Sequence, residues 1–356
     1  MIGAGARSAR DNARSIAGTL RAWPARWPSR LLTETCHARS GGDRAACGVM
    51  INMGLIRRAL VIRAPRIVGR VSSSPEKLAG ALATTGYLAD PGLATAGWLA
   101  LRLGRPLFLE GDAGVGKTSF GLALAQAEGV PLIRLQCYEG LDAAQALYDW
   151  DFPRQILHLR TVEAVGGQRD PSAVEASLYD RRFLVARPLL RALEAAPCVL
   201  LIDEIDRADD EFEAYLLELL ADWAVTIPEL GRIAAAIPPI AVITSNRTRE
   251  VHDALKRRCL YHWVEHPSPE RELAILRVRA PEVTERVAAQ ITQATKRLRG
   301  MELVKPPGVA EAIDWALALA ALGVEELNGE VAALTIGAVV KVREDAERVK
   351  ELDWSA

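Results

Sequence analysis

The sequence predicts an α/β protein with a parallel five-stranded sheet flanked by helices, followed by a small all-helical lid. Short apolar runs alternate with helical patterns, which is typical of strand–helix units. A glycine-rich segment joins the first apolar run to a helix, and two later runs end in acidic or amide residues. No strand is expected beyond Pro267. We therefore expect an α/β nucleotide-binding domain over 74–267 and a helical lid domain over 268–356.

The glycine-rich segment is Gly111-Asp-Ala-Gly-Val-Gly-Lys-Thr118, and its G-x-x-x-x-G-K-T spacing is typical of a phosphate-binding loop. Its glycines let successive N–H groups face a polyphosphate, and the helix start adds the positive end of its dipole. Lys117 can then reach the terminal phosphates, and the Thr118 hydroxyl can ligate Mg²⁺. The predicted phosphate-binding residues are Gly111, Asp112, Ala113, Gly114, Val115, Gly116, Lys117, Thr118 and Ser119.

Two acidic residues follow the strand Cys198-Val-Leu-Leu-Ile, at the edge where parallel sheets bind ligands. Asp203 is placed to hold Mg²⁺ through its water shell. Glu204 is placed to polarise a water aimed at the γ phosphate, as a general base. Asn246 ends the next apolar run and could orient that water. The sequence thus predicts a magnesium site formed by Thr118 and Asp203, with Glu204 and Asn246 as catalytic residues.

The composition limits the possible partners. Residues 1–70 hold thirteen Arg and three acidic residues, whereas the rest holds 31 basic and 42 acidic residues. A compact acidic domain is not an obvious nucleic-acid binder. The cysteines are scattered without metal-ligand spacing, which suits a reducing cytosol. No apolar run is long enough to span a bilayer, so we expect a soluble, cytoplasmic protein.

Residues 1–73 form a basic leader of different composition. One interpretation is an arm that contacts nucleic acid or membrane, and another is a transit-type presequence, because acids are few and Arg is frequent. We favour a disordered leader, or a translation start placed too far upstream with the native start at Met50 or Met53, because this composition cannot bury a core.

The remaining elements follow from capping residues and periodicity. Tyr87 and the Gly104-Arg105 corner precede the phosphate-binding loop, where a purine ring could be held. The expected elements are helices from Ser74, over 93–103, 183–195 and 209–223, strands over 131–136, 239–246 and 260–264, a mobile loop over 166–181, a hairpin over 225–231, and lid helices from Ser268, over 282–299, 307–322 and 329–351.

The order of these motifs resembles that of the AAA+ ATPases. The insert from Tyr138-Glu-Gly-Leu-Asp142 through Tyr148-Asp-Trp150 and the hairpin Thr226-Ile-Pro-Glu-Leu-Gly231 look like the MoxR branch. The segments Leu255–Trp263 and Lys305-Pro-Pro-Gly resemble the CoxD-like members, which are linked to the maturation of molybdenum hydroxylases such as carbon monoxide dehydrogenase.

The resemblance implies ATP and Mg²⁺ as cofactors and a role for each motif. Lys117 and Thr118 become the Walker A pair, Asp203 and Glu204 the Walker B pair, and Asn246 sensor 1. An arginine of one subunit completes the neighbouring site in this superfamily. Arg258 fits that position best and Arg257 is close behind, although a solvated basic helix end is the alternative. Where many relatives have a sensor 2 arginine, this chain has Lys305, which supplies charge but no bidentate fork.

The resemblance also implies a ring of identical subunits, with a hexamer as the expected size, a protein client and a partner with a von Willebrand A domain. The leading prediction is an ATP-driven remodelling or insertion chaperone. A motor acting on DNA or RNA is the alternative within the superfamily, although the acidic charge of residues 71–356 argues against it. A scaffold that binds ATP without hydrolysis is the alternative from another class, against which the complete set of motif residues argues.

Overall fold

The computed structural model describes residues 72–164 and 170–350, together with residues 352 and 354. The predictions for residues 1–71, and for residues 166–169 of the expected mobile loop, lie outside the described residues. In the described part of the chain, no helix combines the length and the apolar composition needed to cross a bilayer.

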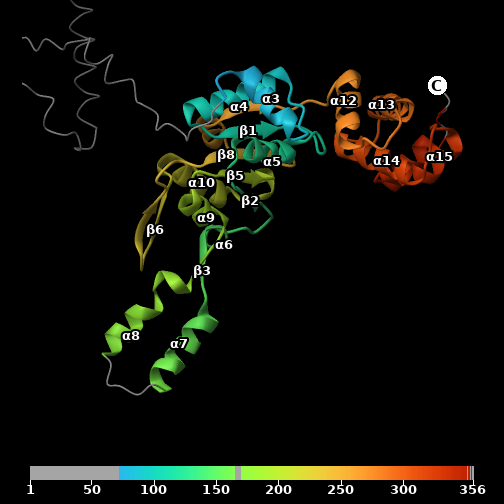
Figure 1. The fold of residues 1–356 in the computed structure, drawn as a ribbon. Helices are drawn as coiled ribbons and strands as arrows, with labels where there is room; N and C mark the ends of the chain where they lie inside the picture. The colour runs from blue at the N-terminus through green and yellow to red at the C-terminus, as the bar shows by residue number, and fades with distance from the viewer. Residues whose placement is uncertain (1–71, 165–169, 351, 353, 355–356) are drawn as a thin grey trace, which may run out of the picture. The chain divides into compact units, whose positions relative to one another are not determined.

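Five parallel strands form the central sheet, as the sequence predicts (Figure 1). Their order is β2-β5-β8-β1-β9, so β2 and β9 are the edge strands. All four ladders are parallel, which brings the carboxyl ends of the strands to one edge. The strands are β1 (Leu107–Glu110), β2 (Leu132–Gln136), β5 (Val199–Asp203), β8 (Ile240–Ser245) and β9 (Leu260–Trp263).

Helices cover both faces of the sheet because the central strands are apolar on both sides (Figure 1). Leu107, Leu109 and Leu201 pack in one cluster with the helices α3 (Pro75–Thr84), α4 (Pro91–Leu103) and α5 (Lys117–Glu128). Phe108, Leu200 and Ile202 pack in the other with α9 (Pro188–Ala195) and α10 (Asp210–Asp222). The short helices α6 (Ala143–Leu147) and α11 (Asp253–Arg258) complete this part.

An insert between α6 and α9 corrects two predictions. The antiparallel strands β3 (Tyr148–Trp150) and β4 (Leu184–Ala186) form a short ladder, beyond which lie α7 (Phe152–Ala164) and α8 (Pro171–Leu178) (Figure 1). The expected loop over 166–181 therefore contains a helix, which Asp170 caps by accepting from the backbone N–H of Ser172. The expected helix over 183–195 begins only at Pro188, because residues 184–186 pair with β3.

A second ladder confirms the predicted hairpin. Strand β6 (Ala224–Ile227) pairs antiparallel with β7 (Gly231–Ala234). Gly231 adopts a φ of +78°, so the turn after Leu230 needs a left-handed residue that glycine provides without steric cost.

The C-terminal region is helical, as predicted, and packs around the fully buried Trp315. Its helices are α12 (Pro269–Arg279), α13 (Glu285–Arg299), α14 (Val309–Ala321), α15 (Gly329–Thr335) and α16 (Arg343–Val349). The single helix expected over 329–351 is wrong. The Trp315 indole donates to the Thr335 hydroxyl (2.8 Å), and the chain turns there so that Val339 and Val340 enter the core.

Candidate nucleotide-binding and hydrolysis site

The phosphate-binding loop lies between β1 and α5 and is built on glycine backbone angles. Gly111, Gly114 and Gly116 have φ values of +157°, +79° and +97°. A Cβ atom at Gly111 would lie 2.4 Å from the carbonyl oxygen of Val264, so only glycine fits there. The loop thus presents its backbone at the first turn of α5, where the helix dipole favours an anion.

Lys117 is the cation of this loop. Its Nζ donates to the carbonyl oxygens of Gly111 (2.8 Å) and Asp112 (2.6 Å), and the residue is only 5% exposed. Burial lowers the pKa of this ammonium, while nearby carboxylates, Asp112 first among them, oppose the shift. A polyphosphate would supply a much stronger counterion than these carbonyl groups, so the loop and Lys117 fit such a ligand.

The other predicted loop residues have separate positions. Asp112 lies close to His266, with 3.4 Å between Oδ2 and Nε2. Val115 packs in the core beside α3 and α4. Ala113 and Ser119 line the cavity described below.

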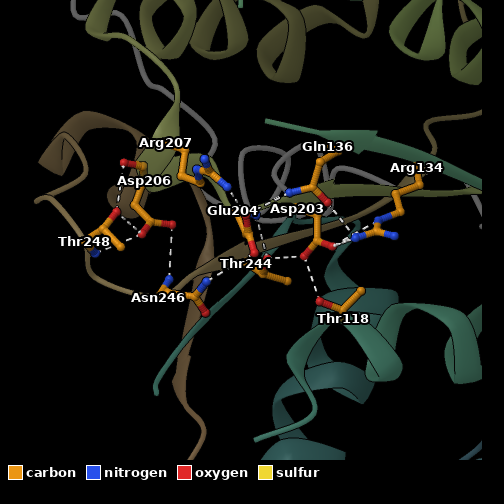
Figure 2. A network of polar contacts seen from close by, with 10 residues as sticks. All are labelled: Thr118, Arg134, Gln136, Asp203, Glu204, Asp206, Arg207, Thr244, Asn246 and Thr248. Atoms are coloured by element: carbon orange, nitrogen blue, oxygen red, sulfur yellow. Dashed lines mark hydrogen bonds and ion pairs between the residues drawn. The ribbon is translucent and has the colours of Figure 1, made fainter. Parts of the chain in front are cut away.

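Asp203 and Thr118 meet at the carboxyl end of β5 (Figure 2). The Thr118 hydroxyl donates to Oδ1 of Asp203 (2.9 Å), and the buried Thr244 hydroxyl donates to the same oxygen (2.6 Å). A hydroxyl and a carboxylate beside a phosphate-binding loop are the oxygen ligands that Mg²⁺ prefers. The two predicted metal residues therefore form a donor set that fits Mg²⁺.

Glu204 and Asn246 are also brought together (Figure 2). Glu204 has a left-handed backbone (φ +56°), and its N–H donates to the Thr244 hydroxyl (2.9 Å). Its side chain accepts from Asn246 Nδ2 at 3.4 Å and from Gln136 Nε2 at 2.9 Å. Non-glycine residues in this conformation store strain and cluster at functional sites. Arg207 also donates to Oε2 of Glu204 (3.3 Å), so two amides and a guanidinium hold the carboxylate while part of it stays exposed.

Asp206 is a buried carboxylate of this edge for which no role was predicted from the sequence. It accepts from the backbone N–H groups of Asn246 (3.1 Å) and Thr248 (2.9 Å) and from the Thr248 hydroxyl (2.6 Å). Burial raises the pKa of Asp206, but these hydrogen bonds outweigh it and leave the pKa below its usual value. Asp206 therefore fixes the loop after β8 that carries Asn246.

Strand β2 supplies two further residues that the sequence reasoning missed. Arg134 and Gln136 extend toward Asp203 and Glu204 from the sheet edge (Figure 2). The sequence could have revealed them, because Arg134 and Gln136 are two residues apart in a strand expected to be buried. This spacing puts both side chains on one face of the strand.

A cavity of about 770 Å³ opens beside the loop. This volume is typical of small-molecule sites. Tyr87 lines it, as the purine prediction requires, but Arg105 does not. Arg105 instead donates to the carbonyl oxygens of Arg257, Arg258 and Cys259 at the end of α11. The Gly104-Arg105 part of that prediction is therefore wrong.

Other predicted residues lie away from this cavity. Lys305 does not line it, and the Lys305 N–H donates to Asp345 Oδ2 (2.9 Å). Two arginines of α12, Arg271 and Arg279, line it instead.

Arg257 and Arg258 are exposed on α11 and do not line the cavity either. The Arg258 guanidinium donates to the Leu217 carbonyl of α10.

Comparisons with known proteins find one family model and several solved structures similar to this chain. No curated protein sequence matches the chain. Among solved structures, it is similar to the RuvB Holliday junction branch migration motor of Thermotoga maritima, with 15% identity, a TM-score of 0.41, and 80% of this chain and 74% of that chain covered. A point mutant of that motor matches with 16% identity, a TM-score of 0.42, and 72% and 69% coverage. Residues 106–259 match the family model described as AAA domain (dynein-related subfamily). Residues 106–259 are thus similar to an AAA domain of the dynein-related subfamily, and the described residues have an AAA+ P-loop fold with a helical C-terminal region.

Proposed function

We propose that the protein is a ring-forming ATPase of the MoxR branch that uses ATP hydrolysis to remodel or mature a protein client. The observation that carries the proposal is the meeting of Asp203, Glu204 and Asn246 at one sheet edge beside the phosphate-binding loop. A sheet edge that only stabilised the fold would not need two carboxylates and an amide next to a buried lysine, because charged groups are costly to bury without a partner.

Each residue has a role in the proposed reaction. Lys117 and the loop N–H groups bind the polyphosphate. Thr118 and Asp203 would hold Mg²⁺, which supplies positive charge to the phosphate oxygens. A water oxygen attacks the γ phosphorus while the bond to the bridging oxygen of ADP breaks. Glu204 accepts the proton of that water, and Asn246 keeps Glu204 and the water in position.

The insert supports a protein client. Phe152 and Leu157 of α7 are 60% and 65% exposed, and Ile156 between them is 53% exposed. Large apolar side chains gathered on one surface helix are typical of a protein-binding surface. We place the client contact on this insert and on the β6–β7 hairpin near Leu230. A molybdenum hydroxylase such as carbon monoxide dehydrogenase is the proposed client, and a von Willebrand A domain protein the proposed partner.

The test is the ATPase rate per subunit as a function of protein concentration, with and without double-stranded DNA. We expect a rate that rises cooperatively with concentration and is unchanged by DNA, because the site is completed between subunits. Strong stimulation by DNA would support a nucleic-acid motor instead. Absence of hydrolysis at every concentration would support a scaffold that only binds nucleotide.

Glu204→Gln tests the proposed base. We expect this variant to bind ATP as wild type does but to hydrolyse it about 100-fold more slowly or worse, since an amide cannot accept the proton. Binding of a fluorescent ATP analogue and release of phosphate are measured on the same preparation. Turnover equal to that of wild type would refute the role of Glu204.

A further inference from the structure

Arg134 pairs with the carboxylate that is proposed to hold Mg²⁺. Its side chain extends from β2, an edge strand, and is 51% exposed, whereas Asp203 is 1% exposed. Both Nε (3.0 Å) and one terminal nitrogen (2.5 Å) of the guanidinium donate to Oδ2 of Asp203. The two threonine hydroxyls occupy Oδ1, so the two oxygens have different partners (Figure 2).

This pairing places a full positive charge next to the metal-binding carboxylate. A cation within 3 Å of a carboxylate weakens the attraction of that carboxylate for a second cation. Because half of the Arg134 side chain is exposed, water screens part of this effect without removing it. Arg134 should therefore neutralise part of the charge of Asp203 and lower the affinity of the site for Mg²⁺.

The same guanidinium also acts on the second carboxylate through Gln136, which donates to Glu204 beside Asn246 and Arg207. A terminal nitrogen of Arg134 donates to Oε1 of Gln136 (2.6 Å), and Nε2 of Gln136 donates to Oε2 of Glu204 (2.9 Å). An arginine offers only donors, so it fixes the amide with its oxygen toward Arg134 and its nitrogen toward Glu204. A reversed amide would face Glu204 with an oxygen and lose that hydrogen bond.

We propose that Arg134 is a positioning residue with two separable actions: its charge weakens Mg²⁺ binding at Asp203, and its planar fork orders Glu204 through Gln136. This inference rests on the proposed nucleotide site and deepens it. The two actions require different properties of one side chain. The charge is shared by lysine, but the fork that reaches Asp203 and Gln136 together is not.

The first experiment measures Mg²⁺ dependence without turnover. Binding of fluorescently labelled ADP to the full chain is titrated with Mg²⁺ in wild type, Arg134→Gln, Arg134→Lys and Gln136→Leu. In Arg134→Gln, we expect the Mg²⁺ concentration for half-maximal binding to fall on the order of threefold to tenfold, because the competing charge is gone. In Arg134→Lys and Gln136→Leu it should stay close to wild type.

The second experiment measures ATP turnover at saturating Mg²⁺ and ATP. Arg134→Lys and Gln136→Leu should both lose turnover, by about tenfold, since each weakens or removes the hydrogen bond from Gln136 and leaves Asn246 and Arg207 alone to hold Glu204. The matched control is Arg181→Gln, which removes a similarly exposed arginine of the insert that pairs with Glu194 of α9. That variant should leave both measurements unchanged.

Several outcomes would overturn the proposal. If Arg134 only supports Asp203 mechanically, Arg134→Gln will need more Mg²⁺ than wild type, which is the opposite sign. Full turnover in both Arg134→Lys and Gln136→Leu would remove the link to Glu204. Circular dichroism and Mg²⁺-free ADP binding check that each variant is folded. If wild type binds no nucleotide at any Mg²⁺ concentration, the proposed function fails together with this inference.

Discussion

Asp203, Glu204 and Asp206 lie within four residues of each other, yet each has different partners. Asp203 accepts from two hydroxyls and a guanidinium, and Glu204 accepts chiefly from side-chain amides. Asp206 accepts mostly from backbone N–H groups of the loop after β8. The partners suit separate tasks: Asp203 would hold the proposed metal, Glu204 would take the proton of the proposed water, and Asp206 holds the loop that carries Asn246.

The task of Asp206 can be tested through its titration. Because its pKa is lowered in the folded protein, its contribution to stability is present above the unfolded-state pKa, near 3.8, and is lost as pH falls through the folded-state value. Asp206→Asn should lower the free energy of unfolding by about 1–3 kcal/mol at pH 7, because an amide cannot accept all three hydrogen bonds.

Urea unfolding of wild type and Asp206→Asn at pH 7 and at pH 3.5 measures this. The difference between the two proteins should shrink at the lower pH, where the wild-type carboxylate begins to lose its charge. A difference of the same size at both pH values would contradict the assignment.

At the level of elements, the N-terminus of α14 touches the phosphate-binding loop through backbone atoms. The N–H groups of Val309 and Ala310 donate to the Gly114 carbonyl oxygen (3.0 and 3.3 Å). A Cβ atom at Gly308 would lie 2.7 Å from Gly114 Cα and 2.9 Å from the Ala113 carbonyl oxygen. Glycine at 308 is therefore a condition for this contact.

Gly308→Ala should separate α14 from the loop. We expect a loss of about 1–3 kcal/mol in the free energy of unfolding, as for other overpacked positions, together with weaker ADP binding. Gly337→Ala is the control, because a Cβ atom there has nothing within 4 Å. Equal ADP affinity in both variants would show that the contact does not matter for the nucleotide.

The elements that the sequence predicted correctly have strong local signals. The loop glycines, the apolar strands ending in Asp203 and Asn246, and the Leu230-Gly231 hairpin tip depend on nearby residues alone. The errors have physical causes too. Strand β4 has three residues, too few for a period to appear, and its pairing with β3 is tertiary. The break after Thr335 depends on a hydrogen bond from Trp315, 20 residues earlier.

Within the candidate site, the motif residues were expected from the sequence, whereas Arg134 was missed and Lys305 was misplaced. Motif spacing identified Lys117, Thr118, Asp203, Glu204 and Asn246, which the structure brings together. Arg134 was missed because its partner is decided by the pairing of β2 with β5, which places it opposite Leu201 and near Asp203. Lys305 was chosen for its charge and sequence position, but it lies outside the cavity. The roles of all these residues, and the domain boundary near residue 267, stay predictions.

At the scale of the whole molecule, the exposed arginines of α11 are the residues that we propose complete the site of a neighbouring subunit. Arg257 and Arg258 face solvent and do not line the cavity of their own chain. Arg105 nevertheless holds the end of α11 through three carbonyl oxygens, and Lys256 of α11 pairs with the buried Glu110 (3.2 Å). A helix held this firmly, with an exposed basic end whose Arg258 guanidinium donates to the Leu217 carbonyl of α10, is compatible with the proposed contact to a neighbouring subunit.

A mixing experiment tests action between subunits. Arg258→Ala and Lys117→Ala should each be inactive alone, the first for lack of the neighbour's arginine and the second for lack of nucleotide. Mixed one to one, they should recover about a quarter of wild-type turnover. In about a quarter of the interfaces, an intact Lys117 of the first variant faces an intact Arg258 of the second. Steady-state phosphate release measures this. A mixture that stays inactive would contradict a shared site, and activity of Arg258→Ala alone would point to Arg257.

The backbone contact between α14 and Gly114 also makes that helix a lever. The thirteen residues of α14 span about 20 Å, begin at a carbonyl oxygen of the loop and carry Trp315 in the core of the C-terminal region. If the loop reorients so that α14 and the helices packed on it tilt by about 10°, the far end of α14 moves by roughly 3 Å. Small rearrangements of the loop around a phosphate would in this way move the far end of α14 by several ångströms.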